Sequence, residues 1–261
     1  MAPKLFTPKP TAESTFDHTT LEKEFQNIIE KQNFPRNAPL ADPHPSACKT
    51  FVVATSTRAA GEPVLMQTYD NFPSNEAFNC EIWEAARATS AAPTYFVPIT
   101  INRVAYCDGG TGWNNPVQLA LDEAHNIWPN RPIACVISIG TGLRDAIQLG
   151  ATENNQTFAR YLISKVSAKT SFKLNVAEWC VELVTSSEAT HSRLAARTDR
   201  LGLEEKYFRF NVPQSMSKIG LADWEKIDDM IALAEDYMRK GDMRRTKHRV
   251  GVILLNPVST G

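Results

Sequence analysis

The sequence predicts an α/β fold, and three observations support that class. Segments with the β-branched content or alternation of strands are interleaved with segments of helical periodicity. Glycine and proline turns separate these segments. Hydrophobic residues make up 43% and charged residues 22% of the 261 positions, so the chain can bury a sizeable core. We therefore expect a layered α/β sheet with a helical C-terminal region.

The first half of the chain supplies most of the predicted strands. An irregular, Pro- and Thr-rich lead-in is followed by a helix over 19–31, with Leu21, Phe25, Ile28 and Ile29 expected on one face. A proline-punctuated loop comes next. The segments with strand character are KTFVVATS (49–56), VLMQTY (64–69), TYFVPI (94–99) and NRVAYC (102–107). A helix over 76–91 is predicted between the second and third of them.

The second half begins with a well-delimited helix over 114–128. Asn114 or Asn115 can cap it, and Pro116 suits its first turn. The apolar run PIACVISI (132–139) is typical of a strand covered on both faces. Beyond it, the pattern predicts helices over 156–196 and 224–239 and a strand over 206–212.

Charge gives no indication of a nucleic-acid partner. The 28 basic and 29 acidic residues leave a formal net charge of −1, so no long-range attraction to phosphate backbones is expected. A local basic cluster lies near the C-terminus, and a solvated helix end is favoured over a lipid-headgroup site as its explanation. Its members are Arg239, Lys240, Arg244, Arg245, Lys247 and Arg249.

Cysteine and histidine spacing predicts no metal and no cofactor. The five cysteines include no C-x-x-C pair, and the five histidines have no metal-ligand spacing. The N-terminus has no secretory apolar stretch, and the longest apolar runs fall short of a membrane span. We expect a cytoplasmic chain, with any membrane contact peripheral.

The sharpest local motif is AYCDGGTGWNNPV, residues 105–117. Asp108 leaves a predicted strand and is followed by Gly109 and Gly110, then by the capped helix. Glycine permits a sharp turn with positive φ, which can aim the preceding carboxylate into a pocket. Taken alone, Asp-Gly-Gly is a common turn.

The flanking sequence adds specificity to this motif. The blocks WEAARATSAAPTYFVPI, CDGGTGWNNPV and VISIGTG resemble, in this order and spacing, three blocks of the patatin-like phospholipase family. The resemblance covers about residues 16–145. It implies a layered α/β/α sheet, incomplete on its N-terminal side, with residues 1–145 forming the C-terminal part of the patatin-like domain. Residues 146–261 are then a mostly helical extension that packs on the same domain.

The same resemblance implies a lipid acyl hydrolase that uses a Ser–Asp dyad. In this family a serine on a Gly-x-Ser-x-Gly elbow attacks a phospholipid or neutral-lipid ester, and the aspartate of the DGG motif takes its proton directly. Carried over to this sequence, Asp108 is the proton acceptor, and Gly109 and Gly110 complete the motif. A serine hydroxyl needs such an adjacent base to become nucleophilic. The residues that bind substrate are not identified by the motifs.

The sequence departs from the family pattern at the nucleophile. In the family, the oxyanion loop and the serine elbow both precede the matched segment. No two of the 12 glycines lie four apart with a serine midway between them. We therefore expect an N-terminally truncated member that is inactive as this chain, which leaves open whether the protein is an enzyme. The alternative is a non-catalytic pseudoenzyme module that binds lipid or a partner.

Other candidate residues are better explained by structure than by chemistry. Ser90 could replace the nucleophile, although close helix packing is the favoured role. Ser138 lies within an apolar strand, where burial with a hydrogen bond is expected. Residues 140–142 (GTG) fit a strand-ending turn better than a phosphate cradle. Tyr95 and Phe96 could line an acyl-chain pocket, with core packing the favoured alternative.

Overall fold

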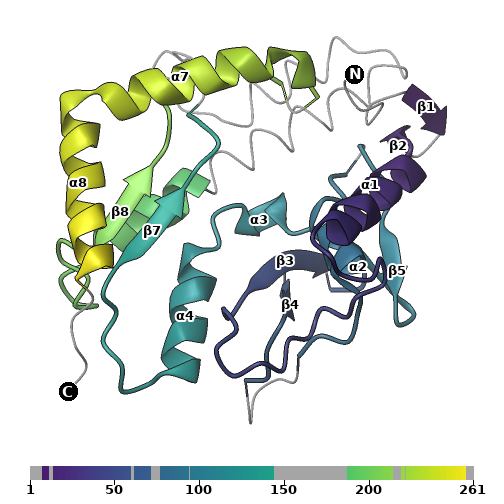
Figure 1. Ribbon diagram of the computed structural model, residues 1–261, viewed down its shortest axis with the longest axis horizontal. Helices are drawn as coiled ribbons and strands as arrows, with labels where there is room; N and C mark the ends of the chain where they lie inside the picture. Colours follow the sequence, from purple (N-terminus) through teal and green to yellow (C-terminus); the bar gives the residue numbers. More distant parts are fainter. Residues whose placement is uncertain are drawn as a thin grey trace, which may run out of the picture. The chain divides into compact units, whose positions relative to one another are not determined.

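The computed structural model describes residues 8–11, 14–59, 62–71, 77–93, 95–143, 187–213, 219–220 and 222–256. They form two compact units (Figure 1): the first contains the described residues up to Asn114, and the second those from Asn115 onward. The predicted division at residue 145 lies outside the described residues and stays a prediction.

An antiparallel four-stranded sheet forms the centre of the first unit. Its order is β4-β3-β6-β5, with β3 Phe51–Ser56, β4 Pro63–Gln67, β5 Ile99–Ile101 and β6 Val104–Asp108. Asn102 and Arg103 join β5 to β6 with φ of 49° and 67°, the positive values that a two-residue hairpin turn requires. A separate antiparallel pair consists of β1 Pro8–Thr11 and β2 Ser14–Phe16.

Two helices cover this sheet in successive layers. The first, α1 (His18–Lys31), starts where the Asp17 side chain accepts a 2.9 Å hydrogen bond from the Thr19 N–H. The second, α2 (Ile82–Thr89), contacts β3, β5 and β6, and α1 packs on α2 (Figure 1). This arrangement confirms the predicted α/β class and the N-terminal helix.

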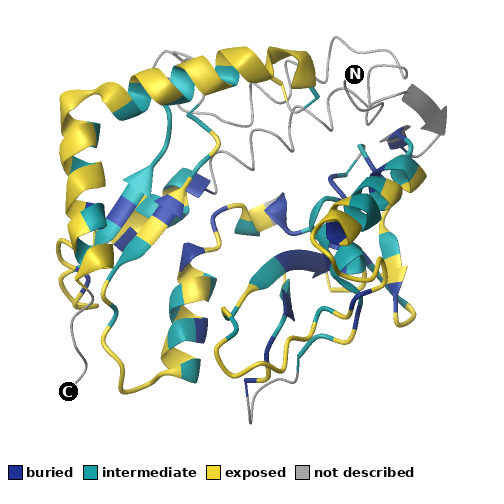
Figure 2. Ribbon diagram, in the orientation of Figure 1, coloured by how far each residue is buried: buried dark blue, intermediate teal, exposed yellow. Residues whose placement is uncertain are grey.

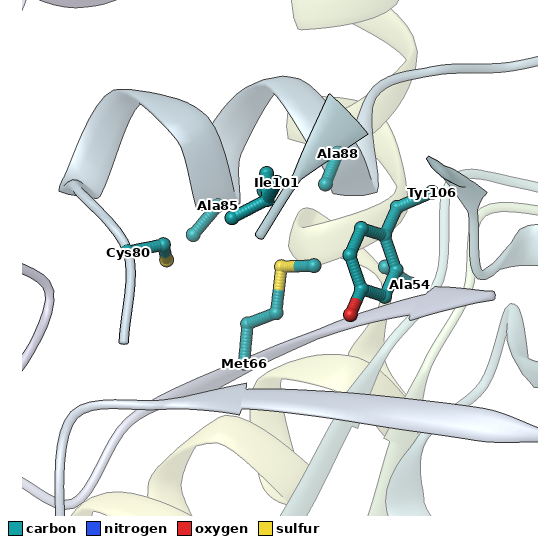
Figure 3. Packing of buried hydrophobic residues seen from close by; sticks show 7 residues of the cluster. All are labelled: Ala54, Met66, Cys80, Ala85, Ala88, Ile101 and Tyr106. Carbon is teal, nitrogen blue, oxygen red and sulfur yellow. The ribbon is translucent and has the colours of Figure 1, made fainter. Parts of the chain in front are cut away.

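Small side chains let α2 lie close to the sheet. Ala85 and Ala88 of α2 face Ala54 of β3 and Met66 of β4 (Figure 3). Tyr106, two residues before Asp108, also belongs to this cluster, and its ring packs edge-on against the ring of Phe78. The strand that carries Asp108 is therefore anchored in a buried hydrophobic cluster of the first unit.

Two predicted elements of the first unit are wrong in their bounds. Residues 95–98 of the predicted strand over 94–99 are not in a strand, because the N–H groups of Tyr95 and Phe96 both donate to the Ala92 carbonyl at 3.0 Å. The helix predicted over 76–91 begins only at Ile82. Residues before it pair elsewhere: Phe78 N–H donates to the Gln67 carbonyl, and the Cys80 carbonyl accepts from Leu40.

The second unit joins a parallel strand pair to several helices. Its elements are α4 Val117–Ile127, β7 Val136–Ile139, β8 Tyr207–Phe210, the 3₁₀ turn η3 Trp224–Lys226, α7 Ile227–Arg239 and α8 Gly241–Leu255. Residues 187–195 are helical too. Val117, Leu194 and Leu203 form its buried centre. The N-cap of α4 is Pro116, so the prediction of Asn114 or Asn115 as the cap is wrong, although the Asn115 side chain accepts a 3.3 Å hydrogen bond from the Val117 N–H.

The predicted strand over 132–139 is shorter and less covered than expected. It begins at Val136, and Ile137 and Ile139 are exposed within the described part of the chain. The apolar run alone could not show that, among the described strands, β7 pairs with β8 and with no other. Residues 156–186 of the predicted helical stretch lie outside the described residues. No described helix combines the length and the apolar character needed to cross a bilayer.

Candidate active site

Asp108 is the last residue of β6, and its backbone is held on two sides. In the sheet it lies opposite Ala54 of β3. On the other side, its N–H donates a 3.1 Å hydrogen bond to the carbonyl of Ala91, in the loop after α2. The strand end and the ATSAAP segment are thus joined directly, although Ala91 and Asp108 are 17 positions apart in the sequence.

Position 109 requires glycine because there is no space for a side chain, and not because of its backbone angles. Its φ is −70°, so the expected positive φ is wrong. A Cβ at this position would lie 2.6 Å from the Val53 carbonyl oxygen and 2.8 Å from the Val53 Cγ1. The same Val53 carbonyl accepts a 2.7 Å hydrogen bond from the Thr89 hydroxyl, so it has little freedom to move away. Only glycine lets the turn after Asp108 pass this close to β3.

The Asp108 carboxylate is held by the turn that follows it. Its Oδ1 accepts a 2.7 Å hydrogen bond from the N–H of Gly110, the first residue of α3 (Gly110–Trp113). The side chain is half-buried. Burial raises the pKa of Asp108 to about 6, and the Gly110 hydrogen bond opposes this rise. A carboxylate with such a pKa is a better-matched proton acceptor near neutral pH than an ordinary aspartate.

Among the described residues, Gly110 is the only hydrogen-bond donor to this carboxylate. Ser90 is the C-terminal cap of α2 and adjoins Ala91, the backbone partner of Asp108. No hydrogen bond joins Ser90 to Asp108 in this part of the chain. Ser138 lies in the second unit, where its hydroxyl bonds the Asn115 side chain at 3.2 Å and accepts from Arg209 at 2.9 Å. The expectation of a buried, hydrogen-bonded Ser138 is confirmed.

The remaining candidates take the structural roles that were favoured. Phe96 is buried, and its ring and that of Tyr95 both lie against Phe16, at 5.8 and 5.7 Å between centroids. Gly140 N–H donates to the Phe210 carbonyl, and Gly142 N–H to the Asn211 side chain, which makes the GTG segment a turn that ends β7. No group of three His, Cys, Asp or Glu side chains suited to a metal occurs in the described ranges.

Sequence reasoning missed the residues that support the motif. Val53, Thr89 and Ala91 hold Gly109 and Asp108 through backbone atoms or a single hydroxyl. Their side-chain types carry no signal for this role, because the register of β3 against β6 decides which carbonyl meets the turn. Thr89 and Ala91 do lie within the ATSAAP block, which is the one sequence signal that could have pointed to them.

Comparison with known proteins identifies the family of this chain. Residues 3–121 match the family model described as patatin-like phospholipase. The chain is 30% identical over 213 residues to a calcium-independent phospholipase A2-gamma of Oryctolagus cuniculus and 29% identical over 213 residues to that of Homo sapiens, with 78% of this chain covered in each. It is 25% identical over 244 residues to an 85/88 kDa calcium-independent phospholipase A2 of Mus musculus, with 88% of this chain covered. The matches span 24%, 25% and 28% of the respective relatives. Residues 3–121 of the chain belong to the patatin-like phospholipase family.

Proposed function

We propose that this chain carries the general-base half of a lipid acyl hydrolase, with Asp108 as the proton acceptor of a Ser–Asp dyad. The observation that supports the proposal best is the state of Asp108. Its carboxylate is half-buried at a strand end, is fixed by one backbone N–H, and has a pKa raised to about 6. A base in that condition can take a proton from a serine hydroxyl without a histidine between them.

The substrate class follows from the relatives. They are named calcium-independent phospholipases A2, so we propose an acyl ester of a phospholipid as the substrate. The reaction would form an acyl-serine with loss of the lysolipid, and water would then release the fatty acid. In the first step the serine proton passes to Asp108, which gives it to the oxygen of the leaving lysolipid. In the second step Asp108 accepts a proton from the attacking water and returns it to the serine oxygen as the fatty acid leaves.

We further propose that the 261 residues do not hydrolyse esters by themselves. They contain no Gly-x-Ser-x-Gly elbow, and no described serine bonds the Asp108 carboxylate. A base without a nucleophile and without preset oxyanion donors leaves little beyond background hydrolysis.

Two experiments test the proposal. A fluorophosphonate, which labels activated serines covalently, should leave the isolated chain unlabelled, and a phospholipid assay should show only background turnover. Labelling of Ser90 or another serine that disappears in Asp108→Asn would contradict the absence of a nucleophile. To test the base directly, a segment with the Gly-x-Ser-x-Gly elbow that the family resemblance implies can be joined ahead of residue 3. The chimera should gain turnover that Asp108→Asn removes, and turnover unaffected by that substitution would refute the role of Asp108.

A further inference from the structure

The helix α8 differs in character between its two halves. Its first half carries four exposed cationic side chains, Arg244, Arg245, Lys247 and Arg249. Its last turns carry three exposed apolar side chains: Val252 is 46% exposed, Leu254 59% and Leu255 83%. Figure 2 shows the exposed positions continuing along the helix to its C-terminal end. Burying apolar side chains of this size is favourable, so their exposure indicates a surface that meets another phase or partner.

Cationic and apolar positions share one side of this helix. Arg245, Arg249 and Val252 follow each other at spacings of four and three residues, so they lie in one row along the helix surface. Val250, by contrast, points into the second unit and is buried. The exposed row therefore leads from guanidinium groups to Val252. Leu255 lies three residues further on, whereas Leu254, four residues after Val250, lies on the other side of the last turn.

The charge on α8 is largely uncompensated by its own helix. Asp242 is its single acidic residue and lies at the opposite end from the leucines. Glu205 approaches Arg249 only to 3.9 Å, and its side chain is 86% exposed. Arg239, at the end of α7, provides a contrast because Glu235 and Asp236 pair with it at 2.6 and 3.4 Å.

We propose that α8 docks this chain on a bilayer surface that contains anionic phospholipids. The basic half would meet the lipid phosphates and carboxylates, and Val252, Leu254 and Leu255 would enter the boundary between headgroups and acyl chains. A second copy of the chain fits this surface less well. Pairing α8 with itself sets arginine against arginine or buries arginines against leucines, and both arrangements are unfavourable.

Vesicle binding by the full chain tests the proposal. Wild-type protein should float with phosphatidylcholine–phosphatidylserine vesicles and bind neutral phosphatidylcholine vesicles at least tenfold more weakly, with the difference shrinking at high salt. The pair Arg244→Gln and Arg245→Gln should lower affinity for the anionic vesicles about 20-fold, at about fivefold per cationic side chain. The pair Leu254→Ser and Leu255→Ser should lower it about tenfold.

Matched controls make the result decisive. Arg239→Gln removes a paired, exposed arginine and should leave vesicle binding unchanged. Asp108→Asn should leave it unchanged too, so failure of the docking proposal and failure of the catalytic proposal are separable. Circular dichroism confirms that each variant is folded. Equal binding to neutral and anionic vesicles, or equal losses in Arg239→Gln and the α8 arginine pair, would overturn the proposal. The proposal would also be overturned if the chain bound no vesicles and instead formed a dimer that the leucine variants dissociate.

Discussion

The N–H of Gly110 donates a 2.7 Å hydrogen bond to the Oδ1 of Asp108, two residues earlier in the chain. The contact favours the ionised carboxylate, whereas burial favours the neutral acid. Burial prevails, because the pKa of Asp108 is raised to about 6 from an ordinary value near 4. One short turn therefore fixes the orientation of the carboxylate without forcing it to stay ionised.

This balance makes the stability of the first unit depend on pH. A carboxyl group whose folded pKa is raised holds its proton longer in the folded state than in the unfolded state. Its favourable contribution is complete below pH 4 and is lost as the pH rises through about 6. Asparagine cannot ionise and can still accept the Gly110 hydrogen bond. Asp108→Asn should therefore raise the free energy of unfolding at pH 8 by about 1–2 kcal/mol, with no gain at pH 4.

Urea unfolding at the two pH values measures this difference. Asp122→Asn is the matched control, because that carboxylate is exposed and accepts a hydrogen bond from the Gln118 side chain. An equal gain for Asp108→Asn at pH 4 and pH 8 would show that desolvation of the carboxylate is not responsible.

The motif could be predicted from the sequence, whereas its supports could not. Residue types and order identified Asp108 at a strand end and the glycines after it. The predicted reason for a glycine at position 109, a positive φ, was wrong, because any residue can adopt the observed φ of −70°. Glycine is needed there because Val53 leaves no space for a Cβ atom. A contact between residues 56 positions apart depends on how strands pair, which periodicity does not encode. The predicted bounds of the helix over 76–91 and of the strand over 94–99 were wrong for a similar reason, because tertiary hydrogen bonds competed with local propensity.

Replacing Gly109 tests the close approach of the turn to β3. In Gly109→Ala the new methyl group would meet the Val53 carbonyl oxygen at 2.6 Å and its carbon at 2.7 Å. Because backbone atoms rather than a flexible side-chain end must shift, the variant should lose about 2–3 kcal/mol of unfolding free energy. Chemical denaturation of the first unit measures the loss.

Gly251→Ala is the control for this substitution. Gly251 lies inside α8, and an added Cβ would meet nothing within 4 Å. Alanine should stabilise that helix by about 0.5–1 kcal/mol. A Gly109→Ala variant as stable as Gly251→Ala would mean that the turn has room for a side chain.

Arg87 places a cation at the centre of the first unit. Its side chain is fully buried, and its Nη1 has no hydrogen-bond partner among the described residues. Burial lowers the pKa of the guanidinium, and Glu22, whose Oε1 lies 3.4 Å from the Nε, opposes this. The Nη2 of Arg87 donates a hydrogen bond to the Val97 carbonyl, which connects α2 to the loop that contains Ala91. Glu22→Gln should cost about 2 kcal/mol, because it leaves a buried charge less compensated.

Glu30→Gln is the comparison for Glu22→Gln. Glu30 pairs with Arg36 at 2.7 Å, a shorter distance than in the buried pair, but both side chains are more than half exposed. Solvent screens such a pair, so no measurable change in the unfolding free energy is expected. A loss in Glu30→Gln as large as that in Glu22→Gln would show that burial does not determine the contribution of these ion pairs.

In the second unit, Arg209 is held by a network that a double-mutant cycle can resolve. Its guanidinium donates to Ser138 at 2.9 Å, Ser187 at 3.1 Å and Glu188 at 2.9 Å, and Asn211 also donates to Glu188. The Arg209 side chain is only 8% exposed.

Glu188→Gln should destabilise the second unit by about 2–4 kcal/mol, because the buried cation loses its counter-charge. Adding Arg209→Met removes that cation, so the double variant should be more stable than Glu188→Gln alone. Hydrogen exchange of the β7 and β8 amides reports the stability of this unit directly. Additive losses in the two substitutions would mean that the charges of Arg209 and Glu188 do not compensate each other.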